Sequence, residues 1–219
     1  MAILVVADTT FPFFLDKILR LRLPMSIHHL RSCLFCGGES RRMGCDKALL
    51  PHPNGGVWLT ALINELLKLS LPLTVVSRHQ AHKQLLNNNE NLSFLQEPPP
   101  WNGPLHALSR VLSSQQGQPL LVLPVDMPRL TVVVLQELIE AWRKYPDQAA
   151  VAHDGQRLQP MLAVIPSAAP FQPLLMEQLG CGELRWQDWL PKVPYQQVAL
   201  PPDALLNANR PEDLAAWSA

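Results

Sequence analysis

The chain has 219 residues, 47% of them hydrophobic, which fits a single domain with a core large enough to fold without disulfides or metals. Eighteen Lys and Arg residues balance eighteen Asp and Glu residues, so the formal net charge is zero. This balance excludes a general attraction to nucleic acid or to an anionic membrane, and any anion site must therefore be local.

Four cysteines are too few and too scattered for the disulfide framework of a small secreted protein, which indicates a reducing, cytoplasmic setting. Cys33 and Cys36 have the spacing of half a zinc site. However, closed zinc sites need four ligands, and no second pair of similar spacing follows. We therefore favour a buried strand for this segment.

The N-terminal part of the chain stands apart from the pattern that follows it. Aspartate and lysine residues interrupt its apolar runs before they reach the ~18 residues needed to span a bilayer. No positively charged region precedes the apolar part, as a signal peptide would require. We interpret residues 1–26 as an extension that is disordered or precedes the true start, and residues 27–219 as the domain.

From residue 30 onward, apolar runs alternate with helical periodicity, as in a sheet whose strands are joined by crossover helices. In chain order we expect a strand at 30–36, a helix around 59–66, a strand at 73–77, a weaker helix at 79–86 and a strand at 92–96. Consecutive prolines then impose an extended loop.

The second half of the chain continues this alternation. In chain order we expect a helix from 105, a strand at 120–123, a helix at 131–145 capped by Thr131, strands at 149–153 and 161–165, helical stretches around 174–179 and 186–189, an edge strand at 195–200, and a closing helix capped by Asn209. The pattern predicts one α/β domain of three layers, with a mostly parallel central sheet and helices on both faces.

The stretch CGGESRRMGCDKALL, residues 36–50, follows the first expected strand. Gly37 and Gly38 allow a sharp turn close to a phosphate, and the arginines and Lys47 supply positive charge. A solvated basic loop is the alternative. Because ligands of open α/β sheets bind at the carboxyl ends of strands, we favour a phosphate site. Asp46 is expected to orient this loop by hydrogen bonds.

A second polar cluster, PVDMP, follows the strand at 120–123. Its carboxylate, Asp126, is well placed to hold Mg²⁺, which takes one or two carboxylates and completes its shell with phosphate oxygens and water. The alternative is a carboxylate that caps the helix beginning at Thr131. Taken alone, the residues leave the two interpretations equal.

Together the two clusters resemble those of the molybdenum-cofactor guanylyltransferases. The signature of that family, G-G-x-S-x-R-M-G-x-D-K, is filled at every fixed position from Gly37 to Lys47. Further landmarks match in order: GPL at 103–105, DMP at 126–128, HDG at 153–155, QP at 159–160 and NANRPEDL at 207–214. The resemblance covers about residues 30–217 and implies a Rossmann-like nucleotidyltransferase fold.

The resemblance implies that the signature loop binds GTP, and that the terminal phosphate of molybdopterin attacks the α-phosphorus and releases pyrophosphate. Such transfer needs positioning and charge neutralisation more than a protein nucleophile. The implied catalytic residues are Lys47, Arg42 and Asp126, with Asp126 as the Mg²⁺ ligand. The implied nucleotide contacts are Phe35, Cys36, Gly37, Gly38, Lys47, Ser77, Glu97 and Asp126.

The implied partners are GTP and molybdopterin carrying molybdenum, together with proteins that deliver molybdopterin or receive the product. Neither nucleic acid nor a membrane is expected. Some positions depart from the family pattern. Glu97 stands where Asp is common, Ser77 where some members have Asn, and Cys36 where Ala is usual, and the GPL element lacks a second glycine.

Several other residues invite a functional interpretation. His106 is not required as a base, because an attacking phosphate monoester is already ionised near neutral pH, and we expect it on a helix surface or near the pterin. His153 and Asp154 either face the pterin or form a simple turn. Among the tryptophans, Trp101 in the proline-rich loop is the candidate for stacking on a pterin, and the others are expected to pack in helices.

Two rival functions can be weighed from the sequence. A related nucleotidyltransferase, acting with cytidine or on a sugar phosphate, is disfavoured because such relatives more often have Ala-Gly in place of Gly37 and Gly38. A non-catalytic molybdopterin carrier is disfavoured by the intact Lys47 and Asp126, since a carrier does not need a metal carboxylate aimed at a triphosphate.

Overall fold

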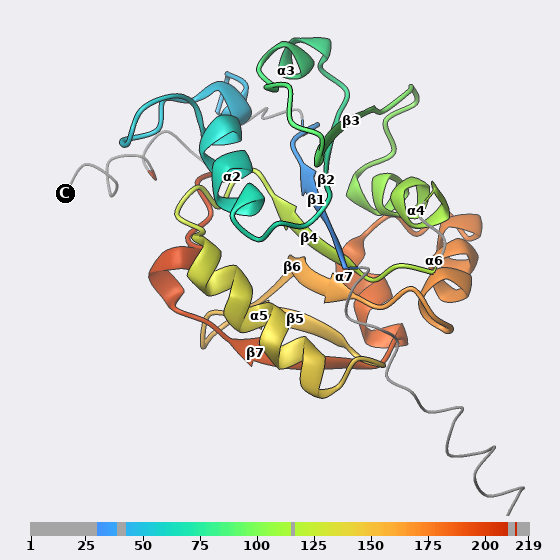
Figure 1. Ribbon diagram of the computed structural model, residues 1–219. Helices are drawn as coiled ribbons and strands as arrows, with labels where there is room; N and C mark the ends of the chain where they lie inside the picture. The colour runs from blue at the N-terminus through green and yellow to red at the C-terminus, as the bar shows by residue number, and fades with distance from the viewer. Residues whose placement is uncertain (1–29, 39–42, 115–116, 210–212, 214–219) are drawn as a thin grey trace, which may run out of the picture.

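The structure is a computed structural model, which describes residues 30–38, 43–114, 117–209 and 213. A seven-stranded sheet with the strand order β3-β2-β1-β4-β6-β5-β7 lies at its centre (Figure 1). The strands are β1 (Arg31–Phe35), β2 (Leu73–Ser77), β3 (Leu92–Gln96), β4 (Leu120–Pro124), β5 (Ala149–His153), β6 (Leu158–Ile165) and β7 (Tyr195–Ala199). β6 pairs antiparallel with β4 and β5, while the other pairings of this sheet are parallel.

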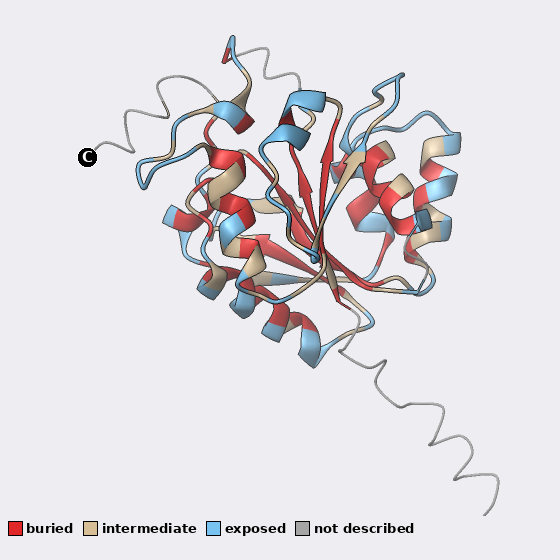
Figure 2. Cartoon of the chain, turned by 45° about the horizontal axis from the view of Figure 1, so that its top comes forward, coloured by how far each residue is buried: buried red, intermediate tan, exposed pale blue. Residues whose placement is uncertain are grey.

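Helices cover both faces of the sheet (Figure 1). They are α2 (Trp58–Leu67), α3 (Gln80–Gln84), α4 (Pro104–Ser114), α5 (Val132–Lys144), α6 (Phe171–Gly180) and α7 (Trp186–Trp189), with 3-10 turns η3 (Lys47–Leu49), η4 (Leu190–Lys192) and η5 (Pro202–Leu205). Because successive strand residues point to opposite faces, Leu34 packs in the core with α2 and α5, whereas Phe35 packs with α4, α6 and α7. Figure 2 shows the central strands buried between these layers.

The predicted α/β fold is confirmed, and most elements lie where the sequence places them. The strands at 73–77, 92–96 and 149–153 match in full, and β7 is an edge strand as predicted. β6 begins at Leu158, three residues before the predicted start, because Leu158 and Gln159 pair with His153 and Ala152 of β5. α3 is shorter than predicted. Residues 1–29 and most of the predicted closing helix lie outside the described residues.

The predicted N-cap position of α5 is confirmed, but the expected capping bond is not formed. Thr131 occupies the N-cap position, but its side chain makes no capping hydrogen bond. Instead, the Val132 N–H donates to Glu65 Oε2 at 2.8 Å, so a carboxylate from α2 satisfies the first turn of α5. A negative charge is favourable there because the helix N-terminus carries a partial positive charge.

Cys33 and Cys36 are both buried beside the central strands, in agreement with the strand interpretation. The Cys36 thiol donates to the Val76 carbonyl at 3.4 Å, and burial raises the pKa of both thiols. The neutral thiol is therefore the favoured form, whereas a metal ligand must be a thiolate.

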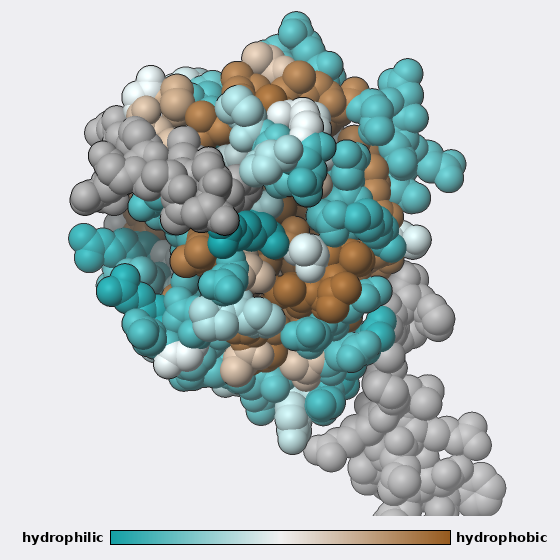
Figure 3. Space-filling view, turned by 90° about the vertical axis from the view of Figure 1, so that its left-hand side faces the viewer, coloured by the Kyte–Doolittle hydropathy of each residue, from teal (hydrophilic) through white to brown (hydrophobic). Residues whose placement is uncertain are grey.

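The surface of the molecule is mixed in character. On the face shown in Figure 3, hydrophilic residues cover most of the area and hydrophobic residues gather near the centre. Within the described parts of the chain, no helix combines the length and the apolar character needed to cross a membrane.

Candidate functional site

A cavity of about 580 Å³ lies where the carboxyl ends of β1 and β4 meet. After β1 the chain continues to β2 and β3 on one side of β1, and it then crosses to form β4 on the other side. Open α/β sheets bind ligands at such a reversal of the strand order. The cavity brings together seven of the residues predicted from sequence: Phe35, Cys36, Gly37, Gly38, Lys47, Glu97 and Asp126. Arg42, the remaining predicted catalytic residue, lies outside the described residues.

Lys47 links three separate segments at the cavity. Its Nζ donates to Asn209 Oδ1 at 2.6 Å and lies 3.3 Å from Asp126 Oδ2. Its side chain is only 12% exposed, so the ammonium group is held in place. The loop after β1, the loop after β4 and the closing segment of the chain therefore converge on one positive charge.

Asp46 orients the loop that carries Lys47, as the sequence predicts. It occupies the N-cap position of η3, and its Oδ1 accepts a hydrogen bond from the Ala48 N–H at 3.0 Å. Its Oδ2 lies 2.8 Å from His82 Nε2. Both carboxylate oxygens are thus engaged in holding the turn that begins at Lys47.

Asp126 follows β4 and faces the cavity with Lys47. Burial raises the pKa of the Asp126 carboxyl, and the nearby Lys47 ammonium opposes this shift. A partly desolvated carboxylate with one lysine beside it can accept a second cation. The described residues contain no cluster of three or more His, Cys, Asp or Glu side chains that would hold a metal without other ligands. This arrangement fits Mg²⁺, which binds through one or two carboxylates and substrate phosphates.

Gly37 allows the end of β1 to approach its neighbours closely. A Cβ atom at this position would lie 2.7 Å from Glu97 Oε2 and 3.2 Å from the backbone nitrogen of Arg78. Gly38 has open space around it. Packing therefore favours glycine at the first position of the signature, whereas the second glycine leaves open space beside the backbone.

Glu97 lies directly after β3 on the opposite wall of the cavity. Its N–H donates to the Ser77 carbonyl at 2.9 Å, and its Oε1 lies 3.6 Å from Arg110 Nη1. Burial raises the pKa of Glu97, while Arg110 and Arg78 act in the opposite direction. The two arginines therefore favour the charged form of this carboxylate, which lies in the wall of the cavity.

Ser77 is predicted as a nucleotide contact, but the structure does not bring its side chain into the cavity. It is fully buried at the end of β2. Its Oγ accepts a hydrogen bond from the His79 N–H at 3.0 Å and lies 2.8 Å from His82 Nδ1. A serine at a strand end commonly accepts a hydrogen bond from the backbone N–H two residues later. Here this local turn keeps the Ser77 hydroxyl out of the cavity lining.

Two cavity residues lie side by side at its rim. Trp101 is 51% exposed, and its indole N–H donates to the Glu97 carbonyl at 3.1 Å. The Arg78 guanidinium carbon lies 5.2 Å from the centre of the Trp101 ring, within the range of a cation–π contact. Sequence reasoning singled out Trp101 but missed Arg78, whose position directly after β2 was the available signal.

Asn209 was predicted to cap the closing helix, whose first turn lies outside the described residues. In the described structure its side chain accepts from Lys47, a contact that the sequence did not predict. Its backbone N–H donates to Asp213 Oδ2 at 2.7 Å. Asp213 thus satisfies the backbone N–H of Asn209, while the side-chain oxygen of Asn209 binds Lys47.

The remaining candidates lie away from the cavity lining. His106 is half-buried on α4. Asp154 Oδ1 accepts from the backbone N–H groups of Gln156 and Arg157, and His153 Nδ1 accepts from the Gly155 N–H. These hydrogen bonds show that the segment forms a turn. The buried tryptophans Trp58, Trp142, Trp186 and Trp189 pack in the core, as predicted.

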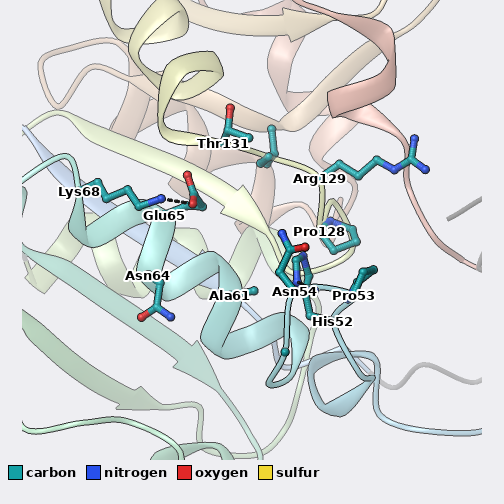
Figure 4. Close-up of a pocket in the computed structure, with 12 residues that line it drawn as sticks. His52, Pro53, Asn54, Ala61, Asn64, Glu65, Lys68, Pro128, Arg129 and Thr131 are labelled. Atoms are coloured by element: carbon teal, nitrogen blue, oxygen red, sulfur yellow. Dashed lines mark hydrogen bonds and ion pairs between the residues drawn. The ribbon is translucent and has the colours of Figure 1, made fainter. Parts of the chain in front are cut away.

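A second cavity, of about 460 Å³, lies between α2 and the segment that leads from Asp126 to α5. Figure 4 shows the ion pair of Glu65 and Lys68 on one side, and His52 and Asn54 beside Pro128 on the other. Partial burial disfavours the charged carboxylate, yet hydrogen bonds from Lys68 and from the backbone of α5 lower the pKa of Glu65. This cavity is built around the junction of α2 and α5.

Known proteins resemble the chain over most of its length. The family model of the MobA-like NTP transferase domain matches residues 32–190. A probable molybdenum cofactor guanylyltransferase of Rhodopirellula baltica is 35% identical over 191 residues, 84% of this chain and 90% of the relative. A protein of the same name from Synechococcus elongatus is 32% identical over 200 residues, 85% of this chain and 95% of the relative.

The fold is shared with the crystal structure of molybdopterin-guanine dinucleotide biosynthesis protein A from Archaeoglobus fulgidus. The TM-score is 0.67 at 17% identity, covering 85% of this chain and 95% of that chain. The family matched by sequence and the fold matched by structure agree with the resemblance carried by the signature loop. The chain therefore belongs to the MobA-like NTP transferase family and is a nucleotidyltransferase.

Proposed function

We propose that this enzyme transfers GMP from GTP to molybdopterin carrying molybdenum, forming the guanine dinucleotide and releasing pyrophosphate. The observation that carries the proposal is the convergence of Lys47, Asp126 and Asn209 at one cavity. The choice of guanine and of the molybdenum cofactor rests on the signature and on the names of the relatives. The cavity, of about 580 Å³, has the size of a small-molecule site.

In this proposal an oxygen of the acceptor phosphate attacks the α-phosphorus of GTP, and the bond from that phosphorus to the bridging oxygen of the β-phosphate breaks. Lys47 neutralises charge that moves onto the departing pyrophosphate. Arg42 is assigned to the same phosphates from the signature alone. The backbone of Phe35, Cys36 and Gly37 lines the nucleoside side of the cavity, where Glu97 completes the wall.

Asp126 is proposed to hold Mg²⁺ together with the nucleotide phosphates. The bound ion would neutralise phosphate charge and fix the geometry of the triphosphate. Lys47, on the other side of the Asp126 carboxylate, keeps it oriented toward the cavity. Proteins that deliver molybdopterin or receive the product, and a cytoplasmic location, remain predictions from the resemblance.

The direct test is a product assay with purified protein, molybdenum-bearing molybdopterin and Mg²⁺, with GTP and CTP compared in parallel reactions. We expect pyrophosphate and the guanine dinucleotide from GTP, and little product from CTP. Preferential use of CTP would instead identify a cytidylyltransferase of the same fold. No pyrophosphate release with either nucleotide would support the carrier function and contradict the proposal.

A further inference from the structure

We infer that His82 is a positioning residue. Its hydrogen bond to the Asp46 carboxylate fixes the turn that begins at Lys47, and with it the position of Lys47. The inference rests on the proposed role of Lys47 in the transfer reaction. His82 does not line the cavity and its side chain is 0% exposed, so it cannot touch the substrate. Its effect must pass through the residues that it contacts.

The contacts of His82 form a continuous hydrogen-bonded chain. Its Nε2 lies 2.8 Å from Asp46 Oδ2, and its Nδ1 lies 2.8 Å from Ser77 Oγ. The ionised Asp46 carboxylate can only accept, which assigns the hydrogen of the neutral His82 ring to Nε2 and leaves Nδ1 to accept from the Ser77 hydroxyl.

The chain continues from Asp46 to the residue that acts. Asp46 uses its other oxygen to accept from the Ala48 N–H, which closes the turn that begins at Lys47. Residues 43–50 lie outside the seven-stranded sheet, and an isolated bridge between Pro51 and Val57 follows them. The bond from His82 thus connects the turn to the end of β2, a fixed element of the sheet.

The charged surroundings of the imidazole fit a neutral donor. Asp46 faces Nε2, and the His79 ring lies with its centre 5.2 Å from that of His82. Burial lowers the pKa of His82, with Asp46 opposing and His79 adding to the shift. A neutral ring leaves the negative charge of Asp46 in place beside Lys47, whereas an imidazolium would neutralise it.

Two amide substitutions separate positioning from a general structural role. In His82→Gln, the side-chain amide nitrogen can reach the place of Nε2 and donate to Asp46. In His82→Asn, the shorter amide occupies the place of Nδ1 and keeps contact only with Ser77. Both variants bury a polar amide in the same site, so their stabilities should be similar. His52→Gln, in the second cavity, is the control.

We expect kcat/KM of His82→Asn to be about tenfold below that of His82→Gln, with His82→Gln and His52→Gln near the wild type. Asp46→Asn should add little to His82→Asn, since both changes break the same link. Equal kcat/KM for the two amide variants would contradict the inference while leaving the proposed function intact.

A second measurement is independent of turnover. Hydrogen exchange at the Ala48 N–H, which Asp46 protects, should be faster in His82→Asn than in His82→Gln. This comparison decides the inference even if the wild-type protein transfers no nucleotide, an outcome that by itself would contradict the proposed function alone. Equal exchange rates in the two variants would overturn the role of His82.

Discussion

At the scale of single residues, the site depends on one lysine that is shared between three segments. Lys47 lies between Asp126 and Asn209, and each contact removes freedom from its long side chain. The ammonium is therefore oriented by the fold before a phosphate arrives. Preorganised charge of this kind stabilises a transition state without a further cost of reorientation at the moment of reaction.

Replacing Lys47 or Asp126 by alanine should lower kcat by at least tenfold, because each removes more than about 1.4 kcal/mol of transition-state stabilisation. Pyrophosphate release under saturating nucleotide measures the effect. Lys68→Ala and Asp203→Ala are matched controls, since these exposed side chains lie away from the cavity, and both should stay within about twofold of the wild type. If Lys47→Ala and Asp126→Ala behaved like these controls, the catalytic roles would be wrong.

The sequence predicts these residues because their signal is local. A glycine pair, basic residues and a carboxylate at strand ends occur within short stretches that can be read in order. The contact of Lys47 with Asn209 spans 162 positions, and the sequence gives no sign of it. The same holds for His82, which lies in a five-residue helix with no motif of its own.

At the scale of elements, the least expected feature is the way α2 supports α5. Thr131 has the residue type and the place of a helix cap, but Glu65 provides the hydrogen bond. Propensity predicts which residue types can cap a helix, whereas tertiary packing decides which side chain is near enough. The predicted start of β6 was too late for a related reason, since pairing with β5 extends the strand across Pro160 to Leu158.

Glu65→Ala should lower the free energy of unfolding by about 1 kcal/mol, the usual effect of losing a helix-capping acceptor. The partly exposed ion pair with Lys68 should contribute little to this loss. Thr131→Ala, which removes a side chain without a capping bond, should stay within about 0.5 kcal/mol of the wild type. Urea unfolding measures both, and a larger loss for Thr131→Ala would contradict the assignment.

At the scale of the whole molecule, the two cores are separated by the sheet but share its strands. One core packs with α2 and α5, the other with α4, α6 and α7, and alternate residues of β1 and β4 belong to each. Because both cores pack on the same strands, we expect the stability of each core to depend on the other. The predicted single α/β domain follows from this sharing as much as from the order of the elements.

We therefore expect the domain to unfold in one cooperative transition. Trp58 and Trp142 are buried in the first core, and Trp186 and Trp189 in the second, so tryptophan fluorescence reports on both faces of the sheet. In urea, its midpoint should coincide with that of far-ultraviolet circular dichroism. Two separated fluorescence transitions would show that the faces unfold independently.

The bond between Lys47 and Asn209 also bears on how the enzyme is made. A ribosome completes the signature loop, β1 and β4 well before it reaches the asparagine that holds the lysine. A chain that terminates before Asn209 can contain every strand of the described sheet and still lack the side-chain oxygen that binds Lys47. The hydrogen bond that fixes the lysine can therefore form only after all seven strands of the described sheet have been synthesised.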